Sequence, residues 1–215
     1  MMCRQRSLPL DRAALTALGL SVVALLVVLG FSPGPEPARA DEAETDLRKY
    51  EKDVDEAIDK GLAYLAKNQK KDGSFLCPVP ECTAVTSLSA MAFLAKGHTP
   101  GRGPYGEVIN KAIDLVVSVQ QSNGLLISSK DRLGRMYGHG IATLMLSEVS
   151  GMVDADRQEK VDEALGKALK LILAAQDIKK SGHHVGGWRY SPGSKDSDIS
   201  CSGWQLMSLR SARNN

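Results

Sequence analysis

The chain lacks the patterns that mark several large classes of protein. No stretch of its 215 residues alternates apolar and polar side chains between turn residues, so strands are not predicted. Aromatic residues make up only 5% of the sequence. Of the four cysteines, only Cys77 and Cys82 lie close together, and two cysteines do not make a four-ligand zinc site.

An excess of basic side chains is also missing once the first 40 residues are set aside. Residues 1–40 hold four of the 27 basic and two of the 25 acidic side chains, which leaves 23 of each in residues 41–215. A formally neutral chain offers no basic stripe to a phosphate backbone, so we expect no nucleic acid among its partners. Residues 41–215 have the length of one domain, or of part of a larger one.

One long uncharged run is present, at residues 13–31, and three arginines precede it. The segment that follows ends in Ala38-Arg39-Ala40, a small-x-small pattern that suits a signal peptidase. We expect residues 1–40 to be a secretory signal peptide; an uncleaved membrane anchor is the alternative, because the run is long enough to span a bilayer. Either way the protein is expected to be exported, to the periplasm, the cell envelope or the outside, with membrane contact only through this segment.

What the chain does contain is an internal repeat. The segments 57–69, 108–120 and 164–176 read AIDKGLAYLAKNQ, VINKAIDLVVSVQ and ALGKALKLILAAQ. They align a lysine column and a glutamine column: Lys60, Lys111 and Lys167, then Gln69, Gln120 and Gln176. The repeat steps, from 60 to 111 and from 111 to 167, are 51 and 56 residues, which suits a pair of helices with their loops. A function is then to be sought where the modules meet.

Each repeat predicts two helices. In the first segment Ile58, Leu62 and Leu65 share one helical face, and the other two segments carry apolar residues in the same columns. Each segment is followed by a run of small and apolar residues, at 83–97, 138–151 and 200–213. The first helices carry many charges and the second ones few, which indicates an outer and an inner layer. Before the repeats, residues 41–54 form a charged lead-in that is expected to be helical near its end.

The residues around the repeated glutamines resemble a known motif, the QW repeat. The first copy is Lys60-Gly61, Tyr64-Leu65, Gln69, Gly73 and Phe75; the third is Gln176, Gly186, Gly187 and Trp188; the second, Gln120 and Gly124, is degenerate. Residues 55–213 are thereby similar to the superfamily of terpenoid (squalene) cyclases and protein prenyltransferases. The resemblance implies an all-α fold, an α/α toroid-like array of helical hairpins in two concentric layers.

The motif residues themselves are expected to be structural. A glutamine at the end of an outer helix can bond backbone groups of a neighbouring helix end, and the aromatic residue after it can cover that junction. This role is assigned to six residues: Gln69, Gly73, Phe75, Gln120, Gln176 and Trp188. Because such toroids use roughly five to seven hairpins and each needs neighbours, three hairpins indicate an incomplete ring. We expect a fragment of a longer product, truncated at its C-terminus; a homodimer covering the open edges is the alternative.

Two acidic residues before the third inner helix are candidate catalytic acids by the same resemblance. Cyclases of this superfamily protonate an alkene with an Asp-x-Asp-Asp motif. Here Asp196 and Asp198 fit its first part, but Ile199 replaces the last aspartate. The simpler alternative is that Asp198 or Ser200 caps the following helix.

Candidate ligand-binding residues lie at the starts of two inner helices. Tyr137 and His139 open one of them, and Cys201 and Trp204 begin the other. Prenyltransferases of the superfamily bind zinc through Asp, Cys and His, but here the histidine precedes Asp198 and Cys201 instead of following them. We therefore predict no metal and no cofactor. The adjacent pair His183-His184 is expected to be solvated.

The cysteine spacing fits the exported location. Cys77 and Cys82 flank a four-residue loop and can close a small disulfide in an oxidising compartment. Cys201 would then stay a buried thiol.

These observations favour a protein that binds an unidentified small molecule or protein on a concave inner face, with catalysis undefined. The first alternative is an enzyme of the cyclase or prenyltransferase type with Asp196 and Asp198 as acids. The second is a purely structural repeat protein of the cell envelope.

Overall fold

The computed structural model describes residues 38–79, 81–130 and 135–214. Within these ranges the regular structure consists of six α-helices and one short 3-10 helix, without strands, so the predicted all-α class is confirmed. Residues 1–37, which hold most of the predicted signal segment, lie outside the described residues. Among the helices that are described, none combines the length and the apolar character that a membrane span requires.

The chain divides into two compact units, Met1–Val54 and Asp55–Asn215. The described part of the first unit is the start of helix α2 (Ala38–Asn68), so the charged lead-in at residues 41–54 is helical over its whole length. The second unit holds the remainder of α2 and all the other described elements.

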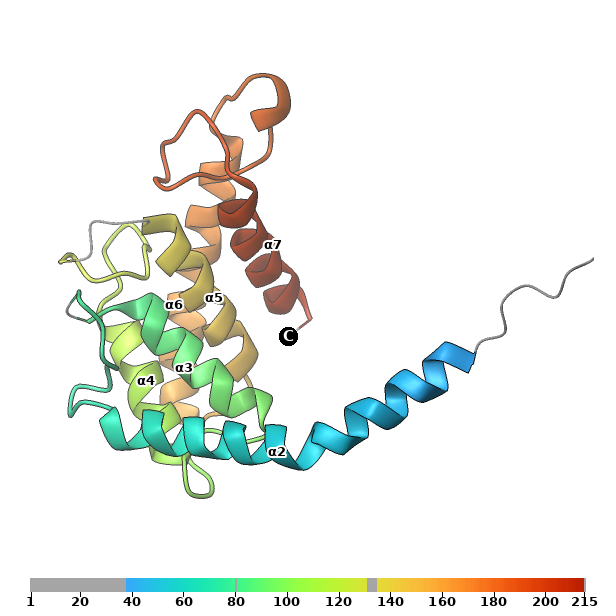
Figure 1. Cartoon of the computed structure of the whole chain (residues 1–215). Helices are drawn as coiled ribbons and strands as arrows, with labels where there is room; N and C mark the ends of the chain where they lie inside the picture. Colours follow the sequence, from blue (N-terminus) through green and yellow to red (C-terminus); the bar gives the residue numbers. More distant parts are fainter. Residues whose placement is uncertain (1–37, 80, 131–134, 215) are drawn as a thin grey trace, which may run out of the picture. The chain divides into compact units, whose positions relative to one another are not determined.

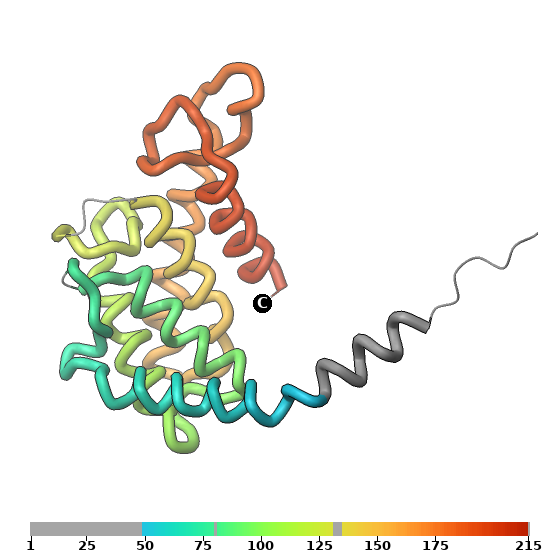
Figure 2. The backbone as a smooth tube through the Cα atoms, in the orientation of Figure 1, coloured from blue at the N-terminus to red at the C-terminus, as the bar shows by residue number. Residues whose placement is uncertain are grey.

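The second unit consists of three helical hairpins that match the three repeats (Figure 1). Their helices are α2 with α3 (Thr83–Ala95), α4 (Gly106–Ser118) with α5 (Arg135–Val149), and α6 (Ala155–Asp177) with α7 (Ile199–Arg213). The short 3-10 helix η1 (Gly182–His184) lies in the long connection from α6 to α7, which Figure 2 traces. Gly97 and Gly151 end the first two hairpins with left-handed backbone, at φ of 91° and 81°, as expected for helix stops.

The second helices of the hairpins form one layer. Helix α5 packs against α3 on one side and α7 on the other, while α4 packs on α3 and α6 on α5 (Figure 1). The inner layer is thus the series α3, α5, α7, with α4 and α6 in the layer behind it. This arrangement is consistent with a toroid-like array. Three hairpins do not show whether such an array closes into a ring.

An apolar core lies between the two layers. Its largest fully buried side chains are Phe93, Ile109, Ile113, Leu126, Met145 and Leu146. Each contributes roughly 1.5–3 kcal/mol by leaving water. A second cluster lies near the connection from α6 to α7 and includes Leu125, Met136, Ile172, Trp188 and Cys201. Buried apolar side chains therefore lie both along the hairpins and at the ends where the loops are.

Candidate functional site

The first hairpin is joined to the second by Gln69, just after the end of α2. Its Nε2 donates to the carbonyl of Gly73 in its own loop at 3.0 Å and to the carbonyl of Val108 in α4 at 2.8 Å. Gly73 has a φ of 90°, and a Cβ at this position would clash with the carbonyl of Lys111. Glycine therefore lets the loop backbone touch the next outer helix.

The second hairpin is joined to the third in the same way. Gln120 Nε2 donates to the carbonyl of Gly124 at 3.0 Å and to that of Ala164 in α6 at 2.9 Å. Gly124 has a φ of 91°, and a Cβ would lie 2.6 Å from the carbonyl oxygen of Lys167. Because Ala164 and Lys167 occupy the repeat columns of the acceptors in α4, the two junctions are equivalent in sequence and in structure.

The third glutamine is only half engaged. Gln176 Nε2 donates to the carbonyl of Gly186 at 3.1 Å, which corresponds to the loop bond of the other two copies. Gly186 again has a positive φ, 77°, but a Cβ there would meet nothing within 4 Å. The side of hairpin 3 that corresponds to the two junctions is therefore open.

Phe75 and Trp188, the two aromatic residues of the motif, are both buried. Phe75 is buried in the main core, and Trp188 is buried in the second cluster. The indole Nε1 of Trp188 donates to the carbonyl of Ile172 in α6 at 2.8 Å, so the ring also ties the long connection to its helix.

Sequence reasoning missed the residues that shape these loops. Asp72 Oδ1 accepts from the amide of Ser74 at 2.9 Å, and Asn123 Oδ1 accepts from the amide of Leu125 at 3.1 Å. Hydrogen bonds from Ser74, first from its hydroxyl and then from its amide, hold the pKa of Asp72 below its ordinary value. The signal was present as Asp-Gly and Asn-Gly pairs at the same distance after the glutamine, which are strong turn formers.

His139 lies in the core and not on an accessible face. Its Nδ1 accepts from the amide of Leu126 at 3.0 Å, and its Nε2 lies 3.3 Å from the carbonyl of Ala168, so the proton is on Nε2. Burial lowers its pKa to about 4, which keeps the ring neutral at physiological pH. The imidazole thus reinforces the second junction, with both nitrogens engaged by backbone groups and no access for a ligand.

Asp198 is the N-cap of α7. It accepts from the amide of Cys201 at 2.9 Å, from the hydroxyl of Ser200 at 2.6 Å and from the phenol of Tyr137 at 3.1 Å. These bonds, with that from Ser200 the strongest, hold its pKa below the ordinary value of an aspartate. The carboxylate is thus stabilised in its ionised form, and the geometry is that of a helix cap.

The other candidate acid has a different partner. Asp196 lies 3.4 Å from Nε of Arg189, whose guanidinium lies 4.4 Å from the centre of the Tyr190 ring. Tyr190 stacks on Tyr137, with ring centres 5.8 Å apart. The structure therefore links Asp196, Asp198 and Tyr137 into one polar and aromatic cluster, in which Asp198 accepts hydrogen bonds and Asp196 forms an ion pair with Arg189.

Cys201 and Trp204 pack α7 against its surroundings. The Cys201 thiol is fully buried and donates to the carbonyl of Arg189 at 3.0 Å, and burial raises its pKa to about 11. Trp204 is half-buried, and a Cβ at Gly140 of α5 would lie 3.0 Å from the Trp204 Cβ. A neutral thiol is a poor metal ligand and a poor nucleophile. Across the described ranges, no three His, Cys, Asp or Glu side chains gather closely enough to hold a metal ion.

The disulfide between Cys77 and Cys82 stays a prediction. Cys82 is buried at the N-terminal boundary of α3, whereas Cys77 is half-exposed in the loop, so the two side chains occupy different surroundings.

The inner layer carries an apolar groove that the sequence did not reveal. It has a volume of about 300 Å³, and its lining comes from α3, α5 and the turn after α5: Met91, Leu94, Ala95, Leu144, Glu148 and Met152. Glu148 is the one charged group in this lining, and it accepts from the hydroxyl of Ser211 in α7 at 2.7 Å.

No protein-family model and no curated protein matches this chain.

Proposed function

We propose that this protein is an exported, toroid-like repeat protein that binds an apolar ligand on its inner layer. The observation that carries the proposal is the groove between α3 and α5. Its volume of about 300 Å³ is at the lower end of the range of small-ligand pockets, roughly 300–1,000 Å³. Two methionines and two leucines give it a lining that can adapt to different apolar shapes.

The kinship with terpenoid cyclases and prenyltransferases is part of the same proposal. It is supported by the junctions at Gln69 and Gln120. In both, the glutamine of the motif donates to a backbone carbonyl of the next outer helix, as expected for a repeated structural motif. The catalytic alternative gains no such support, because Asp198 is the N-cap of α7 and its hydrogen bonds favour the ionised carboxylate.

A thermal-shift experiment on the full chain tests the binding function. The probes are a fatty acid, a prenyl alcohol and a peptide with apolar side chains, and a bound probe raises the melting temperature. Leu144→Lys places a charge in the groove and is expected to abolish the shift.

Leu88→Lys is the matched control, because Leu88 is a leucine on the same layer, exposed and outside the groove. If no probe shifts the melting temperature, or if both variants respond like the wild type, the proposal is wrong.

A further inference from the structure

The two internal junctions define what a hairpin offers to the next outer helix. Each supplies a glutamine amide and a left-handed glycine, and the receiving helix supplies two backbone carbonyls. Hairpin 3 offers the same pair, Gln176 and Gly186, with free space above the glycine. Beside them Leu173 and Val185 are 48% and 68% exposed. Leu173 stands in the repeat column of Val117, which lines the groove between α4 and α6.

Helix α2 offers the complementary surface. The carbonyls that receive the glutamines belong to Val108 and Ala164, and the repeat register places Ala57 of α2 in their column. In the next column Ile109 and Leu165 are buried, whereas the equivalent Ile58 is 40% exposed. The receiving face is therefore buried in α4 and α6 and uncovered in α2.

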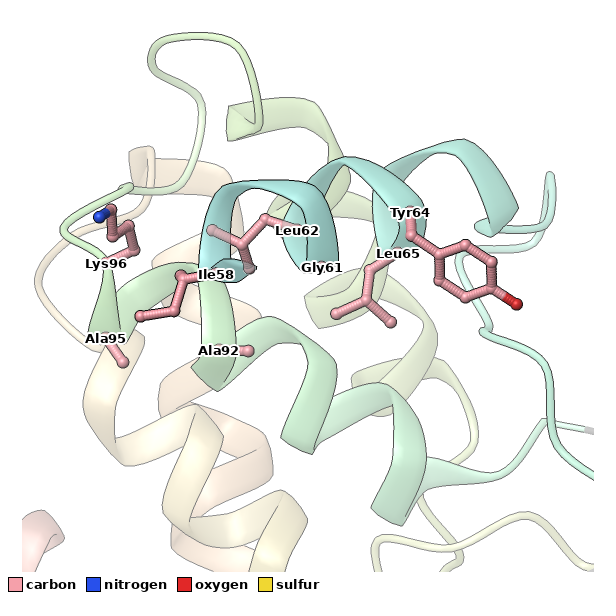
Figure 3. A pocket seen from close by; sticks show the side chains of 8 residues that line it. All are labelled: Ile58, Gly61, Leu62, Tyr64, Leu65, Ala92, Ala95 and Lys96. Atoms are coloured by element: carbon pink, nitrogen blue, oxygen red, sulfur yellow. The ribbon is translucent and has the colours of Figure 1, made fainter. Parts of the chain in front are cut away.

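This uncovered face forms a groove of about 550 Å³ against α3 (Figure 3). Its lining is almost wholly apolar: Ile58, Gly61, Leu62, Tyr64, Leu65, Ala92, Ala95 and Lys96. Figure 3 shows these side chains coming from α2 and from the end of α3. The position of Gly61 is occupied by buried alanines, Ala112 and Ala168, in the other two outer helices.

The net charges of the two surfaces are opposite. Residues 178–198, the connection that carries Gly186, hold four basic and two acidic side chains. Residues 55–60 of α2 hold three acidic side chains and one basic side chain, Lys60, and Lys96 of the groove is paired with Asp55. Opposite charge favours the encounter of these two surfaces over contacts of either surface with itself.

We propose that copies of this chain associate head to tail, with α2 of one copy docked on hairpin 3 of another. Gln176 donates its second amide proton to the carbonyl of Ala57, and Gly186 lies against Lys60, as in the two internal junctions. Gly61, Ile58 and Tyr64 are covered by the connection between α6 and α7 of the second copy. The contact joins different surfaces, so each copy uses one of them as donor and the other as receiver.

Two blocking variants test this arrangement. Gly61→Arg blocks the receiving face, and its Cβ has open space in the monomer. Leu173→Arg blocks the donating face at a side chain that is already half exposed. The control is Ala63→Arg, exposed on α2 two residues and thus about 200° around the helix from Gly61.

Sedimentation equilibrium of the full chain, in a density-matched nonionic detergent, measures the association. Each blocking variant alone is expected to raise the dissociation constant at least about tenfold, while Ala63→Arg leaves it unchanged. A mixture of the two blocking variants is expected to associate again as a one-to-one pair, because each contributes one intact surface.

A wild-type chain that stays monomeric overturns the proposal. So does loss of association in Gly61→Arg without rescue by Leu173→Arg, which would indicate contact between two α2 faces or occupation of the groove by another segment. Neither Gly61 nor Leu173 lines the groove between α3 and α5, so loss of association and loss of ligand binding are measured independently.

Discussion

The junctions after the first and second hairpins differ from the end of the third hairpin in their contacts with a following outer helix. All three have a glutamine bonded to the carbonyl of a left-handed glycine, but only the first two bring that glycine against the next outer helix. The aromatic side chain of the motif varies, from Phe75 to Trp188, while the glutamine and the glycine stay. Among the three repeats of this chain, the hydrogen bond from the glutamine to the glycine carbonyl is therefore more uniform than the packing of the side chain that follows.

The largest effect is expected from placing a methyl group in a closed junction. Gly124→Ala combines left-handed strain with a Cβ only 2.6 Å from the Lys167 carbonyl oxygen, and it is expected to cost about 3 kcal/mol. Gly186→Ala, with the same backbone and open space, is expected to cost about 1 kcal/mol. Urea denaturation of the full chain measures both. Equal losses would contradict the difference between the junctions.

The second junction should respond to pH through His139. The folded pKa of about 4 lies below the unfolded value near 6.5, so the unfolded chain binds more protons between these values. Stability is then complete above about pH 6.5 and falls by on the order of 3 kcal/mol as the pH drops to about 4. His139→Gln is expected to flatten this part of the profile of unfolding free energy against pH.

His183→Gln, an exposed control, should leave the pH profile as it is. A wild-type profile that does not change between these pH values, or one that His139→Gln leaves intact, would contradict the buried neutral imidazole.

The glutamines give a smaller contrast of the same kind. Gln120→Ala removes two hydrogen bonds and is expected to cost about 2 kcal/mol, whereas Gln176→Ala removes one and is expected to cost about 1 kcal/mol. The measurement is the urea midpoint of each variant below the concentration at which copies associate. A Gln176→Ala loss as large as that of Gln120→Ala would mean that the third glutamine has a second partner within its own chain.

The smallest effect is expected at the cap of α7. Asp198→Ala removes an acceptor for the Cys201 amide and should lower the melting temperature modestly, and Asp198→Asn should lower it less because the amide oxygen still accepts. The pKa of Asp198 is lowered in the folded chain. The extra stability that Asp198 gives relative to Asn is therefore present above the unfolded pKa and is lost as the pH falls through the folded pKa. An advantage that persists at low pH would refute an ionised cap.

Much of the fold could be predicted because its signals are local. The two helices of each repeat follow from apolar spacing, and the stops at Gly97 and Gly151 follow from the need for left-handed backbone. The cap at Asp198 is one of two interpretations of a short acidic motif, and the hydrogen bond from the Cys201 amide supports it.

The remaining features depend on contacts between distant residues. His139 lies between two glycines in the sequence, which favours a ligand-binding role. In the structure its imidazole contacts backbone groups of Leu126 and Ala168, which are distant in the sequence. The buried Gln205 of α7, which donates to the carbonyl of Met136 at 2.7 Å, gives no signal within its own helix. The grooves on α2 and on the inner layer arise from the packing of two helices, so one sequence window does not contain them.

The central claim is that successive hairpins are joined by equivalent glutamine contacts. Nuclear Overhauser effects from the side-chain amide protons of Gln69 and Gln120 test it most directly. The account predicts cross-peaks from Gln69 to protons around Val108 of α4 and from Gln120 to protons around Ala164 of α6. Cross-peaks confined to each glutamine's own helix and loop would contradict it.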